Sequence, residues 1–235
     1  IDGNVRYDRA VGSVDTLTNH LNREEIIQAN HKPFGTAIRY SNSTHQLYFY
    51  YAKKYADLTK QPTPEDSRAW SQILVSLLTG INGLGRHKGS DLEDGSDVKS
   101  ANAWGAIDFP RFNGCIKAGT LSSYSNNMSF LDNTPNLYFV LWDNEPNYGN
   151  ERTRIWVVQP RRDPIFREIC EKWYEQKATG IIRSSNFQLH APINENTNIF
   201  RNQCGSLYYP LLFEATWVEN TYIVDYYEPR TITSG

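Results

Sequence analysis

The sequence predicts an α/β (α+β) fold in which a mixed central β-sheet is flanked by helices. Two short runs rich in aromatic and β-branched residues, 136–142 and 154–159, are bounded by Asn, Pro and Gly, which is typical of strands. A helical pattern precedes them at 65–80 and another follows at 163–173. Strands and helices in this order favour a mixed sheet with helices packed against it.

The N-terminal third is expected to be helical. Between residues 15 and 28, apolar residues recur among polar ones, and Asn22 with Glu25 matches a capping box. The Tyr-rich segment 47–58 fits either a helix or a strand. A clearer helix spans 65–80, with two acidic residues in its first turn, apolar residues at a spacing of three and four, and a glycine at its end.

The C-terminal half contributes most of the predicted sheet. Asp163–Pro164 is expected to begin a helix, because Asp is a good N-cap and Pro suits the first helical position. Ile165, Ile169 and Trp173 would form its buried stripe, with Cys170 beside them. The chain is then polar until a final aromatic segment, 207–227, that predicts one or two closing strands.

Length and composition predict a single domain over residues 1–235, with a helical N-terminal region to about residue 85 and a core over 86–235. The net charge of -2 disfavours a uniformly basic nucleic-acid binder, yet it allows a basic cleft beside an acidic catalytic patch. Three cysteines without C-x-x-C spacing disfavour a disulfide framework and a thiolate zinc site, so a cytoplasmic protein is expected. No apolar run approaches the roughly 20 residues that cross a bilayer, so no membrane partner is expected.

The run 90–99 combines a tight acidic turn with an Asp-x-Lys pattern at the start of a strand. We expect a hairpin whose turn is centred on Asp94–Gly95. Because side chains two apart on a strand share a face, the Asp97 carboxylate and the Lys99 ammonium would emerge together. Asp91 would then lie on the paired strand, about one position out of register with Asp97 and near enough to share a metal ion.

This arrangement suits metal-assisted cleavage of a phosphodiester. Hard cations held by carboxylates activate water, neutralise the phosphate and stabilise the leaving oxygen. Asp91 and Asp97 are the first choice of ligands. The backbone carbonyl of Val98 could supply a further ligand. Glu93 and Asp94 compete with Asp91 for its role, although Asp94 better fits a turn residue.

Lys99 is expected to polarise the attacking water or to steady the pentacovalent phosphate. A second acid-x-Lys match, Glu175–Lys177, lies in a helical pattern where residues two apart diverge, so it is interpreted as a decoy. The five histidines lack zinc-site spacing, and no G-x-S-x-G motif surrounds a serine. A solvated surface hairpin is the alternative interpretation of the acidic run taken alone.

The segment 89–117, with D-L-E-D-G-S-D-V-K-S followed by A-I-D-F-P-R-F-N and I-K-A, resembles the catalytic region of type II restriction endonucleases of the PD-(D/E)XK superfamily. The likeness extends more loosely to 186–213. It implies a restriction-endonuclease-like core, a homodimer that cuts both strands of a short duplex site, and Mg2+, or Mn2+ as a substitute, held by the motif acids. It also implies a prokaryotic cytoplasmic protein.

By position, Asp97 matches the (D/E) of the superfamily motif and Lys99 its final Lys. No Pro-Asp dipeptide precedes the turn, so Asp91 takes the place of the leading acid by spacing alone. The resemblance leaves an acid from a helix as the alternative, as in some members of the superfamily. The acids considered for that role are Glu65, Asp66 and Glu25.

Polar residues around and after the catalytic strand are expected to contact DNA. Arg binds guanine and Asn binds adenine bidentately, each good pair contributing about 1–3 kcal/mol of discrimination. For Asn113–Gly114, simple turn formation is the alternative. The expected DNA-contacting residues are Arg86, Lys88, Ser100, Asn102, Arg111, Asn113, Lys117, Arg183, Ser185, Asn186, Gln188, His190, Asn202 and Gln203.

Together these features predict a Mg2+-dependent, sequence-specific endonuclease that acts on double-stranded DNA. One alternative keeps the fold and changes the task to structure-specific repair or recombination. The alternative from another class is a noncatalytic module whose Tyr and Trp side chains stack on bases or sugars.

Overall fold

A five-stranded mixed sheet forms the centre of the computed structural model, which describes residues 33–47, 67–84, 89–104, 106, 108–116 and 128–229. Its strand order is β1-β3-β4-β8-β9. The first pair is parallel and the others are antiparallel, which confirms the predicted mixed sheet. The strands are β1 (Asp97–Asn102), β3 (Leu137–Asn144), β4 (Glu151–Val158), β8 (Leu211–Val218) and β9 (Thr221–Tyr227).

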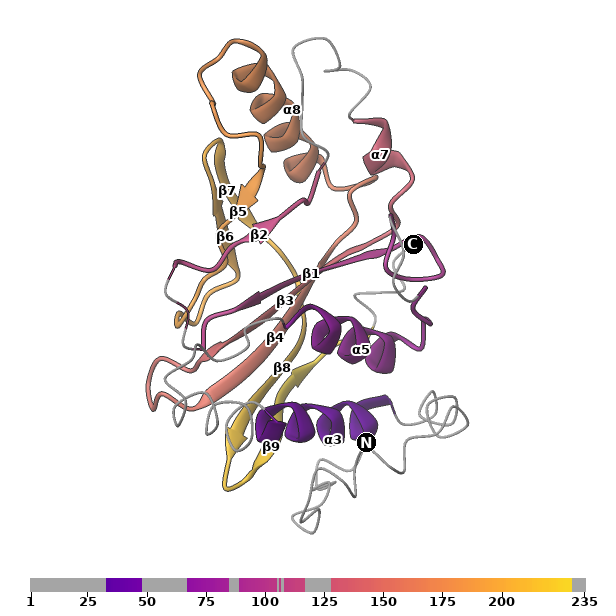
Figure 1. Cartoon of the computed structure of the whole chain (residues 1–235), viewed down its shortest axis with the longest axis vertical. Helices are drawn as coiled ribbons and strands as arrows, with labels where there is room; N and C mark the ends of the chain where they lie inside the picture. Colours follow the sequence, from indigo (N-terminus) through magenta and orange to yellow (C-terminus); the bar gives the residue numbers. More distant parts are fainter. Residues whose placement is uncertain are drawn as a thin grey trace, which may run out of the picture.

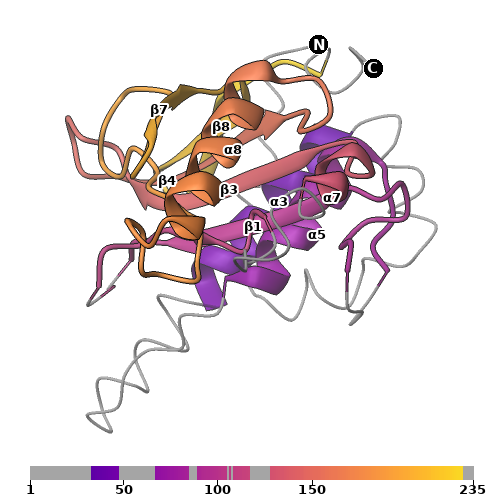
Figure 2. The same ribbon diagram turned by 90° about the horizontal axis from the view of Figure 1, so that it is seen from above.

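Helices cover both faces of this sheet, as predicted. The helices α3 (Pro33–Gln46) and α5 (Arg68–Thr79) lie on one face, and α8 (Pro164–Ala178) lies on the other (Figure 1, Figure 2). Alternate residues of β3 belong to two hydrophobic cores on opposite faces of the sheet. Phe139 packs in the cluster beneath α8, and Tyr138 packs in the cluster beneath α5. Within the described ranges, no helix is both long and apolar enough to cross a membrane.

Short elements extend the α8 side of the molecule. β2 pairs antiparallel with β5, and β6 pairs antiparallel with β7. A short helix, α7, precedes β3. These elements are β2 (Phe112–Asn113), α7 (Ser129–Asp132), β5 (Gln188–Leu189), β6 (Ile199–Asn202) and β7 (Gly205–Tyr208). β8 and β9 lie within the aromatic segment 207–227 and confirm the prediction that this segment forms the closing strands of the sheet.

The described part of the N-terminal region is helical, as expected. α5 begins at Arg68, slightly later than predicted, and ends at Gly80, whose φ of 74° is the left-handed conformation that glycine adopts readily. The expected helix at 15–28 and the Tyr-rich segment 48–58 lie outside the described residues.

α8 begins as predicted, because the Asp163 side chain accepts a hydrogen bond of 2.9 Å from the Phe166 amide. The predicted buried stripe was partly wrong: Ile165 is 54% exposed. The helix instead buries the face centred on Phe166, Cys170 and Trp173, which follow one another at the helical spacing of three to four.

The predicted hairpin over 90–99 was wrong in its pairing. Leu92 forms an isolated bridge with Gly83, whereas β1 pairs only with β3 among the described strands. The turn itself is tight, because the amides of Asp91 and Leu92 both donate to the Ser96 carbonyl at 3.2 and 3.1 Å. The chain therefore closes on itself before a second strand can align with β1.

A buried charge network joins the far end of β3 and β4 to the loop 191–198. Asp143 and Arg152, both fully buried, form a bidentate ion pair at 3.0 and 2.8 Å, and Arg154 adds a contact of 2.7 Å to the same carboxylate. Both arginines also donate to the Glu195 carbonyl. Charge and hydrogen-bond partners thus compensate the desolvation of this cluster.

Replacement of Asp143 by Asn should lower the free energy of unfolding by about 3–5 kcal/mol, because it leaves two buried guanidinium groups short of a carboxylate. Chemical denaturation of the purified variant measures this. Glu195→Gln is the matched control, since it breaks only the exposed pair of Glu195 with Arg201 and should cost less than about 1 kcal/mol. Equal losses in both variants would contradict the assigned role.

Candidate active site

Asp97 and Lys99 occupy alternate positions at the start of β1 and point to the same side of the sheet, as the strand period predicts. The Lys99 Nζ lies 2.5 Å from Asp97 Oδ2. The Asp91 carboxyl is within hydrogen-bonding reach of the Asp97 carboxyl. Two acids and one ammonium, all largely buried, therefore meet at the edge of the sheet.

The free edge of β1 positions Asp91. The Val98 amide points away from β3 and donates to Asp91 Oδ2 at 3.0 Å. The N–H and C=O of a strand residue face the same side, so the Val98 carbonyl also faces this edge. On the other flank, Gln72 of α5 hydrogen-bonds to the Asp91 carboxylate. Asp91 thus reaches the site from a turn, not from the paired strand that the sequence predicted.

Burial and the contact between the two carboxyl groups have the largest effects on the pKa values of this pair. Burial raises the pKa of Asp97 to about 6, and contact with Asp91 adds to the rise, while the Lys99 ammonium opposes it. Burial also acts to raise the pKa of Asp91, but hydrogen bonds from Asp97 and the Val98 amide, with the charge of Lys99, lower it overall. Holding the two buried carboxyl groups in contact therefore lowers the stability of the fold, and a bound cation would offset this loss.

The donor set at this edge fits a hard divalent cation. Asp91, Asp97 and the Val98 carbonyl supply only oxygen, which Mg2+ prefers, and water completes its shell in most protein sites. Across the described ranges, no group of three or more His, Cys, Asp or Glu side chains converges on one point. The cation would therefore rely on two carboxylates of the described residues.

The competing acids of the turn point elsewhere. Glu93 is exposed, and its carboxylate accepts from Asn82 Nδ2 at 3.1 Å, so the structure does not bring it to the pair. Asp94 accepts from the amide and hydroxyl of Ser96 at 2.9 and 2.8 Å, which confirms it as the turn residue. The helical alternatives, Glu65, Asp66 and Glu25, lie outside the described residues.

A polar groove of about 610 Å³ runs over the free edge of β1, beside Lys99. The α5 end of the groove is formed by Ser67 and Arg68, and its other wall comes from β2 and the turn before β5 (Figure 1). Five of the residues predicted to contact DNA line it: Ser100, Asn102, Arg111, Asn113 and Asn186.

Two of these groove residues also have partners inside the protein. Ser100 lies on the α5 face of β1, opposite to Lys99, and its hydroxyl bonds to those of Ser67 and Ser71 at 2.6 and 2.8 Å. Asn102 Oδ1 accepts from the Trp104 amide at 2.8 Å. Arg111 and Asn113 extend from the β2 side of the groove instead.

Six other predicted DNA-contacting residues do not line the groove. Asn202 donates to the Gln188 carbonyl at 2.7 Å and accepts from the Cys204 amide at 2.8 Å, so its side chain holds β5 and the β6–β7 turn together. Those that do not line the groove are Arg183, Ser185, Gln188, His190, Asn202 and Gln203. Arg86, Lys88 and Lys117 lie outside the described residues.

Sequence reasoning missed the contribution of α5. Gln72 contacts Asp91, while Ser67 and Arg68 line the groove. A lone glutamine on an amphipathic helix gives no signal of its role. The serines at positions 67 and 71 were a usable signal, because polar residues four apart on a helix face one direction.

Comparison with known proteins places the chain among the restriction endonucleases. Within that class it belongs to the MamI restriction endonuclease family, whose model matches residues 54–222.

A curated relative is the "Type II restriction enzyme MamI" of Microbacterium ammoniaphilum, which is 29% identical over 178 residues. This match covers 69% of the present chain, and the chain spans about half, 56%, of the relative's length. No solved structure matches the chain.

The raised pKa of Asp97 predicts a pH-dependent stability. The folded pKa, about 6, exceeds the ordinary value of 3.8, so the Asp97 contribution is present below the ordinary value and is lost as pH rises through 6. Without divalent cations, Asp97→Asn should therefore stabilise the protein more at about pH 8 than at about pH 5, by about 1.4 kcal/mol, because only the interval between pH 5 and the folded pKa of about 6 separates the two conditions.

Urea unfolding at both pH values, in EDTA, measures the difference. Asp94→Asn is the control, because it changes a carboxylate on the same turn but outside the pair and should keep the wild-type pH dependence. If Asp97→Asn raised the free energy of unfolding equally at both pH values, the result would contradict the raised pKa of Asp97.

Proposed function

We propose that this chain is a Mg2+-dependent endonuclease that cleaves double-stranded DNA at a specific sequence. One observation carries the proposal: Asp91, Asp97 and Lys99 meet at the free edge of β1, beside a polar groove. Membership of a restriction endonuclease family and the name of the MamI relative support the same activity.

The acidic residues and the lysine have different roles in the proposed reaction. Asp91, Asp97 and the Val98 carbonyl would hold Mg2+, which when bound supplies charge neutralisation and water activation. Lys99 adds a positive charge beside Asp97, where it can orient the attacking water or stabilise the anionic phosphate. Gln72 and the Val98 amide fix the direction of the Asp91 carboxylate.

The order of acid, acid, intervening residue and lysine is the pattern of the PD-(D/E)XK superfamily, and we assign Asp91, Asp97 and Lys99 to it. The groove residues Arg111, Asn113 and Asn186 supply the donors and acceptors that read base edges. Two such centres would cut both strands of a duplex site within one bound complex. We therefore infer a homodimer, since each chain contributes one.

Asp97→Asn should abolish Mg2+-dependent cleavage while duplex affinity falls less than about threefold, because the variant removes a metal ligand and leaves the groove intact. Digestion of a plasmid of known sequence, with end mapping, measures cleavage, and fluorescence anisotropy in EDTA measures binding. Discrete fragments from plain duplex support site-specific cleavage. Cleavage confined to branched or mismatched DNA, or an active variant, would contradict the proposal.

Lys99→Gln should lower the cleavage rate roughly 10²–10⁴-fold, a loss typical for removal of a group that assists proton transfer or charge stabilisation. Lys177→Gln is the matched control. It lies in the other acid-x-Lys match, on α8, where its ammonium donates to the Arg183 carbonyl. Single-turnover digestion should show wild-type rates for this control, and equal losses in both variants would refute the assignment to Lys99.

Mg2+ should raise the melting temperature of the wild type at about pH 8, because a ligand that binds only the folded state stabilises it. The shift should be absent in Asp91→Asn and in Asp97→Asn. Differential scanning fluorimetry with MgCl2 against EDTA measures it. Glu93→Gln is the control, because its carboxylate points to Asn82, and it should keep the shift.

A further inference from the structure

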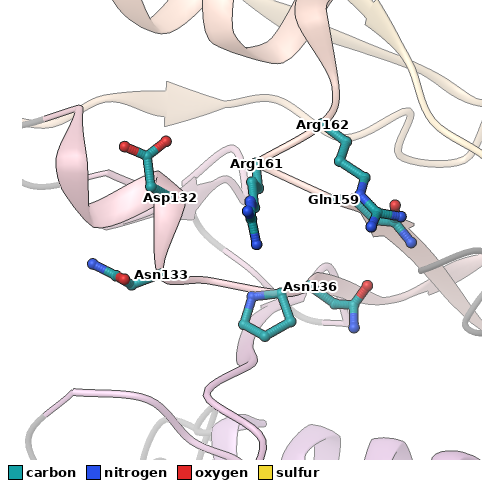
Figure 3. A pocket seen from close by; sticks show the side chains of 7 residues that line it. Asp132, Asn133, Asn136, Gln159, Arg161 and Arg162 are labelled. Carbon is teal, nitrogen blue, oxygen red and sulfur yellow. The ribbon is translucent and has the colours of Figure 1, made fainter.

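A second hollow, lined mainly by residues with polar side chains, lies at the end of the sheet where β3 begins and β4 ends. It has a volume of about 300 Å³ and is distinct from the groove along β1, with which it shares no lining residue. Figure 3 shows Arg161 projecting into its centre. Its lining residues are Asp132, Asn133, Pro135, Asn136, Gln159, Arg161 and Arg162.

The turn between β4 and α8 holds the two arginines of this hollow in place. The amides of Arg162 and Asp163 both donate to the Gln159 carbonyl at 2.9 Å. Asp163 in turn caps α8, whose Phe166 is fully buried. Arg161 and Arg162 therefore project from a short turn anchored at both ends, so little backbone freedom is lost when they bind a ligand.

The charges around this hollow favour an anion. Its carboxylate, Asp132, is engaged by Arg167 at 2.9 Å. Within the described part of the chain, Arg161 forms no ion pair. Two arginines and one acid thus line the hollow, and the exposed Arg161 presents the planar fork that matches phosphate.

The hollow is next to the catalytic cluster. The Asn136 carbonyl accepts from the Asp97 amide at 3.0 Å, and Asn136 Nδ2 donates to Ser96 Oγ at 3.4 Å. Gly95 also packs on the same wall, since a Cβ at that position would lie 3.5 Å from Pro135. The acidic turn and the hollow therefore share the segment 133–136.

The groove and the hollow flank the carboxylates at opposite ends of β1. The groove extends along residues 98–102, whereas the hollow lies before residue 97. Six strand residues span roughly 17 Å, about five base-pair steps at 3.4 Å of rise. A DNA strand that follows the groove past Asp97 would thus bring a neighbouring phosphate to the hollow.

We propose that Arg161 and Arg162 form a DNA backbone phosphate site beyond the catalytic carboxylates, opposite to the groove. This inference rests on the proposed function. The two arginines position the strand across Asp91 and Asp97 without reading its sequence, because phosphate contacts carry no base information. They are positioning residues, and the reacting atoms stay with the acidic cluster.

The test measures how salt affects binding of a fluorescent random duplex of about 30 base pairs, in EDTA so that no cleavage occurs. Arg161→Gln should reduce the slope of log K against log salt by about 0.9, the value for one lost phosphate contact. Arg161→Lys should retain most of the slope. Lys172→Gln removes an exposed charge of α8 away from the hollow and should leave the slope unchanged.

A second arm locates the phosphate. A series of duplexes, each with one neutral methylphosphonate linkage, should reveal one position that weakens wild-type binding and has no further effect in Arg161→Gln. An unchanged slope in Arg161→Gln, with wild-type binding intact, would overturn this inference alone. Failure of the wild type to bind duplex at all would overturn the proposed function.

Discussion

The unpaired edge of β1 is the constraint on which the candidate site depends. An edge strand leaves amides and carbonyls without a strand partner, and folded proteins cover or use them. Here the Val98 amide takes the Asp91 carboxylate as its acceptor, and that bond brings a second acid against Asp97. The carbonyl of the same residue faces the same edge. The hydrogen bond from the Val98 amide therefore brings Asp91 next to the other two oxygen donors, Asp97 and the Val98 carbonyl.

The fold contains two clusters of buried charged side chains, and their charges are balanced to different degrees. At Asp143, two arginines and the Asn194 amide satisfy the carboxylate, so the cluster joins a loop to the sheet. At Asp97, two acids share one ammonium, and burial leaves a carboxyl with its pKa raised to about 6. An uncompensated acid in a largely buried position is costly to stability, and such positions are typical of functional sites.

Local pattern was enough to predict the elements, but not how distant segments meet. The central strands, the start of α8 at Asp163 and the shared face of Asp97 and Lys99 follow from spacing and capping rules. The wrong hairpin shows the limit, because the Asp-Gly turn is present while its leading arm bridges Gly83. Tertiary contacts determine that Leu92 pairs with Gly83, and local sequence propensity does not predict this pairing.

The same limit explains which site residues could be predicted. Strand period distinguishes Asp97–Lys99 from Glu175–Lys177, since two residues apart share a face on β1 and diverge on α8. Gln72 could not be predicted, because it reaches Asp91 only after α5 packs beside β1. Asn202 has a donor and an acceptor like any groove residue, yet both are used within the fold. Residue type thus predicts the chemistry, and packing decides which residues remain free to perform it.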